Sequence, residues 1–218
     1  MQKLFAILRR MTWADFGPDL LAFAGTVICA LLFRWQAKDL IWGLWISSFS
    51  LGYLWILTIL ICAVIFTPGW KRIGAIFGGL FMGAFFTFHY GMFHYVHGVF
   101  LNVFFPLGPQ FSGPPNVLVL IGTALAAYWP FVLMTVVSRV RDFPWRGSMD
   151  DKGEVVFKPY LNVIRMHILI FIFIPLYFLK VTNLAIIPIL IFYFFPWRIF
   201  NRERKAIARE TPRLPDNI

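Results

Sequence analysis

Carboxylates are nearly absent from the apolar part of this chain. Only 10 of its 218 residues are Asp or Glu, and none lies between Asp39 and Asp142 or between Glu154 and Glu203. These stretches therefore lack the paired carboxylates of general acid–base catalysis and the intramembrane carboxylate of a typical proton relay. Their absence also disfavours a magnesium or calcium site, because both cations prefer oxygen ligands.

Other signatures of catalysis are missing as well. The chain has no glycine-rich phosphate loop and no His-Glu-x-x-His motif. Ser47, Ser48 and Ser50 have no activating base beside them, so we interpret them as helix-packing hydroxyls. Cys29 and Cys62 both lie in apolar runs, in opposite halves of the predicted bilayer, and we expect thiols rather than a disulfide. No motif decides whether the chain is an enzyme.

Long apolar runs dominate what is present. Hydrophobic residues make up 60% of the chain and charged residues only 14%, against about 25% charged residues in soluble domains. We predict an all-α fold, a single integral membrane domain over residues 1–218 with six transmembrane helices, each able to cross about 30 Å of hydrocarbon. The predicted spans are roughly 18–35, 40–66, 73–105, 116–138, 159–179 and 182–200.

Proline and glycine mark the predicted breaks. Thr67-Pro68-Gly69 ends the second span, Pro106 follows the third, and Pro130 is expected to kink the fourth. The segment from Met1 to Met11 mixes three basic side chains with apolar ones, which predicts a short amphipathic helix at the membrane surface. The apolar run after it is too long for the core of a signal peptide.

Lysine and arginine are distributed unevenly across the predicted membrane. Sixteen lie on the side that holds both termini, and only Arg34, Lys38 and Lys180 lie on the other. The positive-inside rule then places both termini in the cytoplasm, and we expect a multi-pass protein of the bacterial inner membrane. This bias explains the net charge of +10 without nucleic acid. The expected partners are the lipid bilayer and either other membrane subunits or further copies of the chain.

All four histidines lie within apolar stretches, where an ionisable side chain is costly and marks a candidate functional site. Three of them share one segment of the third span. If His89 is set at zero on a helix, His97 lies at about 80°, Tyr90 at 100°, His94 at 140° and Thr87 at 160°. This arc, from His89 to Thr87, is predicted to face the interior of the bundle.

Imidazole suits zinc, copper, iron or a b-type haem, so we consider all four histidines as ligands. His94 and His97 are three residues apart and can share one metal ion. His89 and His167 match best in predicted depth, with His167 supplied by the fifth span. The alternative is that the imidazoles serve only as hydrogen-bonded contacts between helices. The residues predicted to line the cavity or hydrogen-bond the ligands are Tyr90, Thr87, Tyr160 and Arg165.

Two motifs carry a resemblance to a known family. They are Phe88-His89-Tyr90-Gly91-x-Phe93-x-x-x-His97-Gly98-Val99-Phe100 and Lys158-Pro159-Tyr160-x-x-Val163-Ile164-x-x-His167. The chain resembles a family of uncharacterised bacterial integral membrane proteins, a domain of unknown function, over about residues 20–200. The resemblance implies that His89, His97 and His167 are family positions and that His94 is particular to this chain. It implies no activity.

The chain departs from that family at two places. The family has an acidic residue early in the second span, where this chain reads Trp45-Ile46-Ser47-Ser48, and a histidine near the end of the fourth, where it reads Ser138-Arg139. A family site that uses those groups would be incomplete here.

Three functions follow from these features. The leading hypothesis is an intramembrane histidine site that binds a transition metal or haem, with a redox or metal-handling role. The second is a non-catalytic scaffold subunit of a larger membrane complex, favoured by the short loops. The third is a transporter of a small anion or solute, to which Arg165 and the histidines would contribute.

Overall fold

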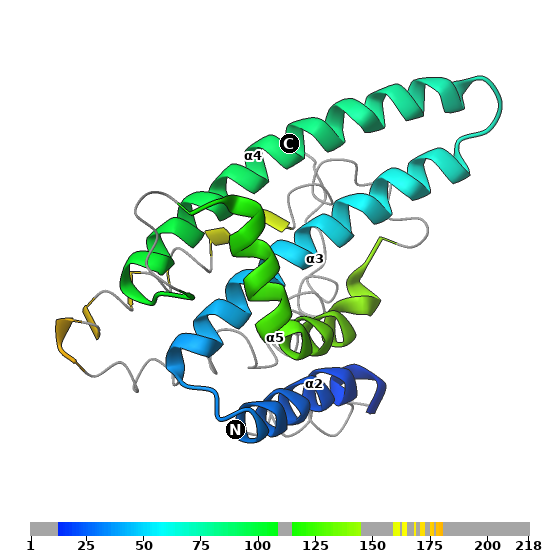
Figure 1. The fold of residues 1–218 in the computed structure, drawn as a ribbon. Helices are drawn as coiled ribbons and strands as arrows, with labels where there is room; N and C mark the ends of the chain where they lie inside the picture. Colours follow the sequence, from blue (N-terminus) through cyan, green and yellow to red (C-terminus); the bar gives the residue numbers. More distant parts are fainter. Residues whose placement is uncertain are drawn as a thin grey trace, which may run out of the picture.

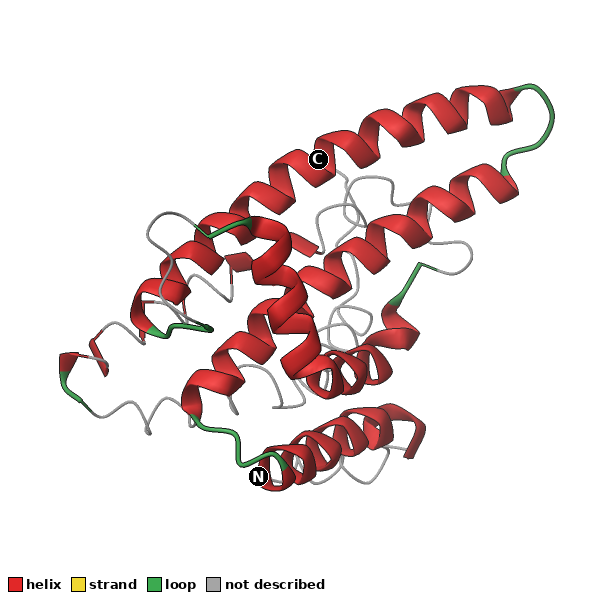
Figure 2. Ribbon diagram, viewed as in Figure 1, coloured by secondary structure: helices red, strands yellow, loops and turns green. Residues whose placement is uncertain are grey.

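The computed structural model describes residues 13–108 and 115–144, and positions 159–161, 163, 164, 168, 171, 172, 175, 176 and 178–180. The described part of the chain contains helices and no strand (Figures 1 and 2). The all-α expectation is confirmed for these residues. The elements are α2 (Trp13–Leu32), α3 (Ala37–Phe66), α4 (Lys71–Phe104), α5 (Val117–Arg139) and the 3₁₀-helix η1 (Val140–Asp142).

Three of these helices are long and apolar enough to cross a membrane, namely α3, α4 and α5. They match the predicted second, third and fourth spans, and on this basis the chain is a membrane protein. Helix α2 begins at Trp13 rather than at the predicted residue 18. The structure does not show six spans. Met1–Met11 and residues 182–200 lie outside the described residues, and the predicted span 159–179 is described only in part.

Local sequence signals account for where the helices begin and end. Gln36 and Asp39 form a capping box at the start of α3. Gly69, with φ of 61°, follows the end of α3 at the predicted break. The side chain of Asn116 accepts a hydrogen bond from Leu118 N at 2.9 Å and caps α5.

Helices α3 and α4 lie side by side and antiparallel as one long hairpin (Figure 1). Helix α5 packs across α3, and α2 packs against α5. The largest buried cluster forms where α3, α4 and α5 meet. It includes Trp42, Trp45, Leu101, Leu120 and Phe131.

Helix α5 is kinked ahead of Pro130, as the sequence predicted. Tyr128 departs from helical geometry, with φ of −123° and ψ of 20°, because the proline ring crowds the preceding turn. The Tyr128 hydroxyl donates to Asp39 Oδ1 at 2.8 Å, and Gln36 N donates to Asp39 Oδ2 at 2.7 Å. One carboxylate therefore ties the start of α3 to the kink in α5.

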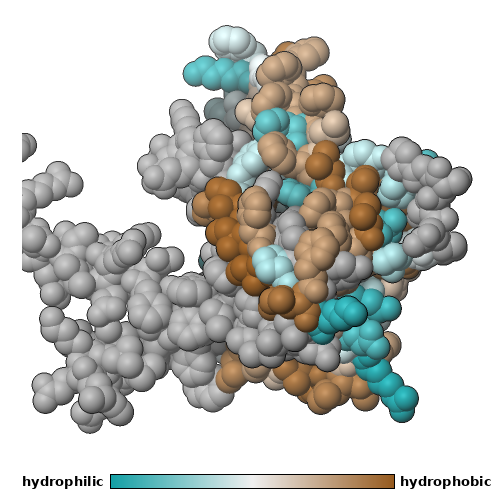
Figure 3. Space-filling model, turned by 90° about the vertical axis from the view of Figure 1, so that its left-hand side faces the viewer, coloured by the Kyte–Doolittle hydropathy of each residue, from teal (hydrophilic) through white to brown (hydrophobic). Residues whose placement is uncertain are grey.

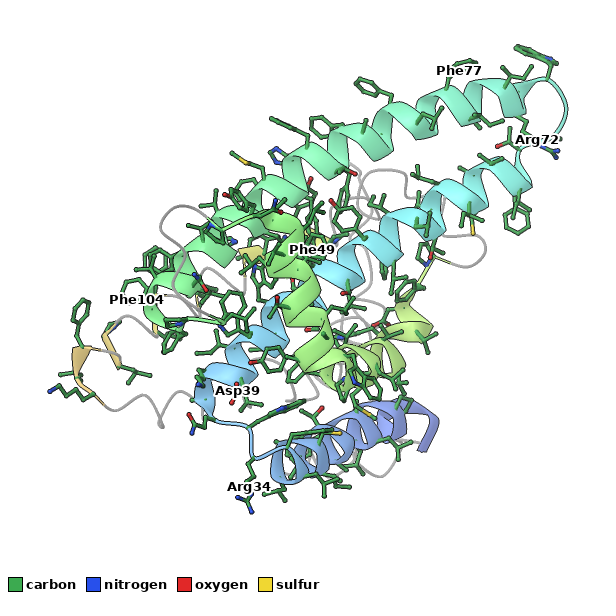
Figure 4. The ribbon with its side chains drawn as sticks, in the orientation of Figure 1. Arg34, Asp39, Phe49, Arg72, Phe77 and Phe104 are labelled. Carbon is green, nitrogen blue, oxygen red and sulfur yellow. The ribbon has the colours of Figure 1, made fainter. Side chains whose placement is uncertain are left out.

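The α3–α4 hairpin has two unlike halves. The near half comprises residues 40–56 and 86–101, and the far half comprises residues 57–85, including the turn. Apolar side chains of the far half are largely exposed, for example Phe77 and Phe81. Figure 4 shows Phe77 on the side of α4 that faces away from α3, and Figure 3 shows apolar side chains over much of one described face. Lipid is the natural solvent for such a surface.

Candidate functional site

The predicted interior arc of α4 is real but narrower than expected. Tyr90, His94 and His97 are buried, and Tyr90 and His94 are almost completely so. His89 and Thr87, at the two edges of the arc, are exposed. The structure therefore separates His89 from the other two histidines of this helix.

His94 lies inside the contact between α3 and α4. Its Nδ1 is 3.1 Å from the carbonyl oxygen of Tyr90, and its Nε2 is 3.3 Å from Ser48 Oγ. A carbonyl oxygen can only accept, so Nδ1 carries the proton, and Nε2 of the neutral ring accepts from the Ser48 hydroxyl. Rings of Trp45, Phe49 and Tyr90 surround the imidazole, with the Tyr90 centroid 4.3 Å away.

Aromatic side chains donate hydrogen bonds to main-chain carbonyl oxygens along the near half of the hairpin. Each donor reaches across from one helix to the partner helix or to its end. In a membrane such bonds satisfy groups that have no water to turn to. In order along α3, the pairs are Trp42 Nε1 to Phe105 O (2.8 Å), Trp45 Nε1 to His94 O (2.9 Å), Tyr90 Oη to Ser48 O (2.7 Å) and Tyr53 Oη to Thr87 O (3.5 Å).

Two glycines allow this close approach. A methyl group on Gly98 would come 2.8 Å from Trp45 Cζ2 and 2.7 Å from Leu120 Cδ2. A methyl group on Gly52 would collide with the Tyr90 hydroxyl. Both sites need glycine for the space that it leaves rather than for its backbone freedom.

His89 occupies a different environment on the rim of α4. Its ring stacks on Phe85 at a centroid distance of 5.5 Å and meets Phe93 edge-on at 5.1 Å. Tyr160 lies on its other side, at 5.7 Å.

Tyr160 brings the second sequence motif against the first. Besides His89, its ring contacts Tyr90 at 5.8 Å and Phe86 at 6.0 Å. Val163 is buried in the same cluster as Phe86 and Tyr90. Tyr160 thus lies beside the histidine segment, whereas the other candidates, Arg165 and His167, lie outside the described residues.

No group of three His, Cys, Asp or Glu side chains that could hold a metal ion occurs among the residues that the structure describes. The contacts of His94 are those of an interhelical hydrogen bond. His97 is buried on the same face of α4. Cys29 and Cys62 do not form a disulfide, as expected.

Sequence reasoning missed the α3 side of this site. It treated Ser48 only as a packing hydroxyl and assigned no role to Trp45 or Tyr53. A signal was present, because Trp45, Ser48 and Gly52 follow helical spacing and share one face of α3. We define the aromatic–imidazole cluster as Trp45, Ser48, Phe49, Tyr53, Tyr90 and His94.

Comparison with known proteins agrees with the expected family of unknown function and adds no activity. No curated protein and no solved structure matches the chain significantly. One family model matches residues 20–199, which include both histidine motifs. The chain belongs to that family, the family of unknown function DUF6498.

Proposed function

We propose that this protein is a non-catalytic scaffold subunit of a membrane assembly, with the near half of the α3–α4 hairpin as its rigid element. The observation that carries the proposal is the placement of His94, whose two ring nitrogens lie 3.1 and 3.3 Å from partners inside the fold. An imidazole held in this way locks two helices together and presents no ligand atom to an external substrate.

The rest of the aromatic–imidazole cluster supports the same role. Its donors end on main-chain carbonyls of the hairpin, and its glycine neighbours leave no space beside the rings. Catalytic sites need room for a substrate and a group that reacts with it. Close packing around buried donors instead favours rigidity.

The proposed topology keeps six spans, with both termini in the cytoplasm of a bacterial cell. Its support is the excess of Lys and Arg on one side of the predicted membrane. Cysteine labelling at Arg34 and at Lys71 tests it, since the two positions should react from opposite sides of the membrane.

Purification in mild detergent tests the scaffold role directly. We expect a colourless protein without stoichiometric metal, and partner chains that co-purify with it. The variant His94→Leu should lower the thermal midpoint and weaken retention of those partners. A bound metal or haem in stoichiometric amount, or a solitary chain that remains monomeric in its native membrane, would contradict the proposal.

A second candidate is a metal or b-type haem held by His97 and His167. Tyr160 contacts the middle of α4 beside Tyr90, while Leu176 packs against the cluster that contains Leu101. The chain between them therefore runs parallel to α4. His97 is seven residues beyond Tyr90, and His167 is seven residues beyond Tyr160. This register favours His97 over His89 as the partner of His167.

Elemental analysis and a visible spectrum distinguish the two candidates. A haem gives a Soret band that His97→Ala and His167→Ala both abolish, whereas zinc gives a stoichiometric signal without colour. His89→Ala is the matched control, because the register argument leaves it outside the site. Full metal or haem content in His97→Ala would exclude this second candidate.

A further inference from the structure

The turn between α3 and α4 combines an exposed aromatic side chain with two basic ones. Trp70 is 80% exposed, and the exposed Lys71 and Arg72 follow it directly. The turn lies at the free end of the hairpin, beyond the other described helices (Figure 1), and Figure 4 shows Arg72 there. No acidic residue occurs between Asp39 and Asp142 to neutralise this charge.

Hydrogen bonds hold the two basic residues in a defined turn. Arg72 Nε donates to the carbonyl oxygen of Thr67 at 3.2 Å, and Arg72 N donates to Gly69 O at 3.2 Å. Gly69 takes the left-handed conformation that the reversal needs. The positive charges are therefore presented from a fixed position at the end of the hairpin.

The length of α3 places this turn among lipid headgroups. Its 30 residues span about 45 Å at 1.5 Å per residue. A bilayer is about 30 Å thick across the hydrocarbon and about 40–45 Å thick with its headgroups. With the start of α3 at one headgroup layer, the turn reaches the other.

We propose that the α3–α4 turn binds the phosphate groups of anionic phospholipids through Lys71 and Arg72, with Trp70 inserted at the interface. Two cations without a neighbouring carboxylate complement a phosphodiester, and an exposed indole suits the headgroup region.

The opposite turn provides a natural contrast. It also carries a tryptophan and two bases, Trp35, Arg34 and Lys38. However, Trp35 packs on Tyr128 at 5.9 Å, and the carboxylate of Asp39 adjoins the bases. This turn therefore has neither the exposed indole nor the uncompensated charge of the α3–α4 turn.

Lipid titration of the full-length protein tests the proposal. Native mass spectrometry and thermal stability would compare phosphatidylglycerol with phosphatidylcholine for the wild type, for K71Q/R72Q and for the matched control R34Q/K38Q. We expect the wild type to prefer phosphatidylglycerol and K71Q/R72Q to lose about 30-fold in affinity for it. The control should change less than two-fold.

Further arms keep the result decisive. K71R/R72K keeps both charges and should keep the preference, which separates loss of charge from misfolding. No preference for phosphatidylglycerol in the wild type, or equal losses in K71Q/R72Q and R34Q/K38Q, would overturn the proposal. If inorganic phosphate reproduces the stabilisation, the turn is a site for free anions and the lipid assignment is wrong.

Discussion

The two halves of the α3–α4 hairpin are made of similar residues but are used differently. In the near half, Phe86 and Tyr90 are completely buried and aromatic donors reach main-chain carbonyls across the helices. In the far half, Phe77 and Phe81 are exposed on helix faces that are equally apolar. Hydrophobicity alone therefore does not hold membrane helices together, because lipid is as apolar as the side chains; close approach and satisfied donors do.

The largest expected difference between the halves comes from removing a buried ring. Phe86→Ala should lower the free energy of unfolding by about 3 kcal/mol, because it empties the contact with Tyr90 and Tyr53. Phe81→Ala removes the same group from an exposed position and should cost less than about 0.5 kcal/mol. Reversible unfolding in mixed micelles measures both. Equal losses would abolish the distinction between the halves.

Adding one methyl group tests the close approach. Gly52→Ala should cost about 2 to 3 kcal/mol, because the new Cβ displaces the Tyr90 hydroxyl from Ser48. Gly78→Ala meets nothing within 4 Å and should be neutral or stabilising, since alanine is the better helix former. Thermal midpoints of the two variants provide the comparison. A tolerated Gly52→Ala would mean that the helices are farther apart than described.

Exchanging a histidine for leucine separates the two imidazole environments. His94→Leu should cost about 2 kcal/mol, because it strands the buried Ser48 hydroxyl and removes the ring from its aromatic neighbours. His89→Leu should change stability by less than about 0.5 kcal/mol, since His89 is exposed and makes ring contacts. Unfolding curves recorded in one detergent suffice. A larger loss for His89→Leu would reverse the assignment of the two histidines.

Much of this fold was predictable because helix ends depend on local signals. Thr67-Pro68-Gly69 and Pro106 ended α3 and α4 as expected, and Pro130 kinked α5. Helix α2 began earlier than predicted because Pro18, six residues into the chain of α2, does not prevent the first turns from forming. Local chemistry thus predicts the elements to within a few residues.

The candidate site was predictable only on one helix. The 100° period placed Tyr90, His94 and His97 inside, but the width of the buried face depends on which neighbours cover its edges, and His89 fell outside it. The contact of His94 with Ser48 needs the register between α3 and α4. That register follows from three-dimensional packing at Gly52 and Gly98, which a one-dimensional pattern does not contain.

Single hydroxyl deletions provide the finest test of the hairpin. Tyr90→Phe removes the 2.7 Å hydrogen bond to the Ser48 carbonyl and should cost about 1 kcal/mol. Tyr53→Phe removes a 3.5 Å contact to the Thr87 carbonyl, next to the far half, and should cost less than half as much. Both variants keep their rings, so packing is unchanged and the difference reports donors alone. Unfolding free energies of the two single variants and of the double variant test this order and its additivity. If Tyr53→Phe costs as much as Tyr90→Phe, the donors remain strong up to the edge of the near half, and exposure alone distinguishes the two halves.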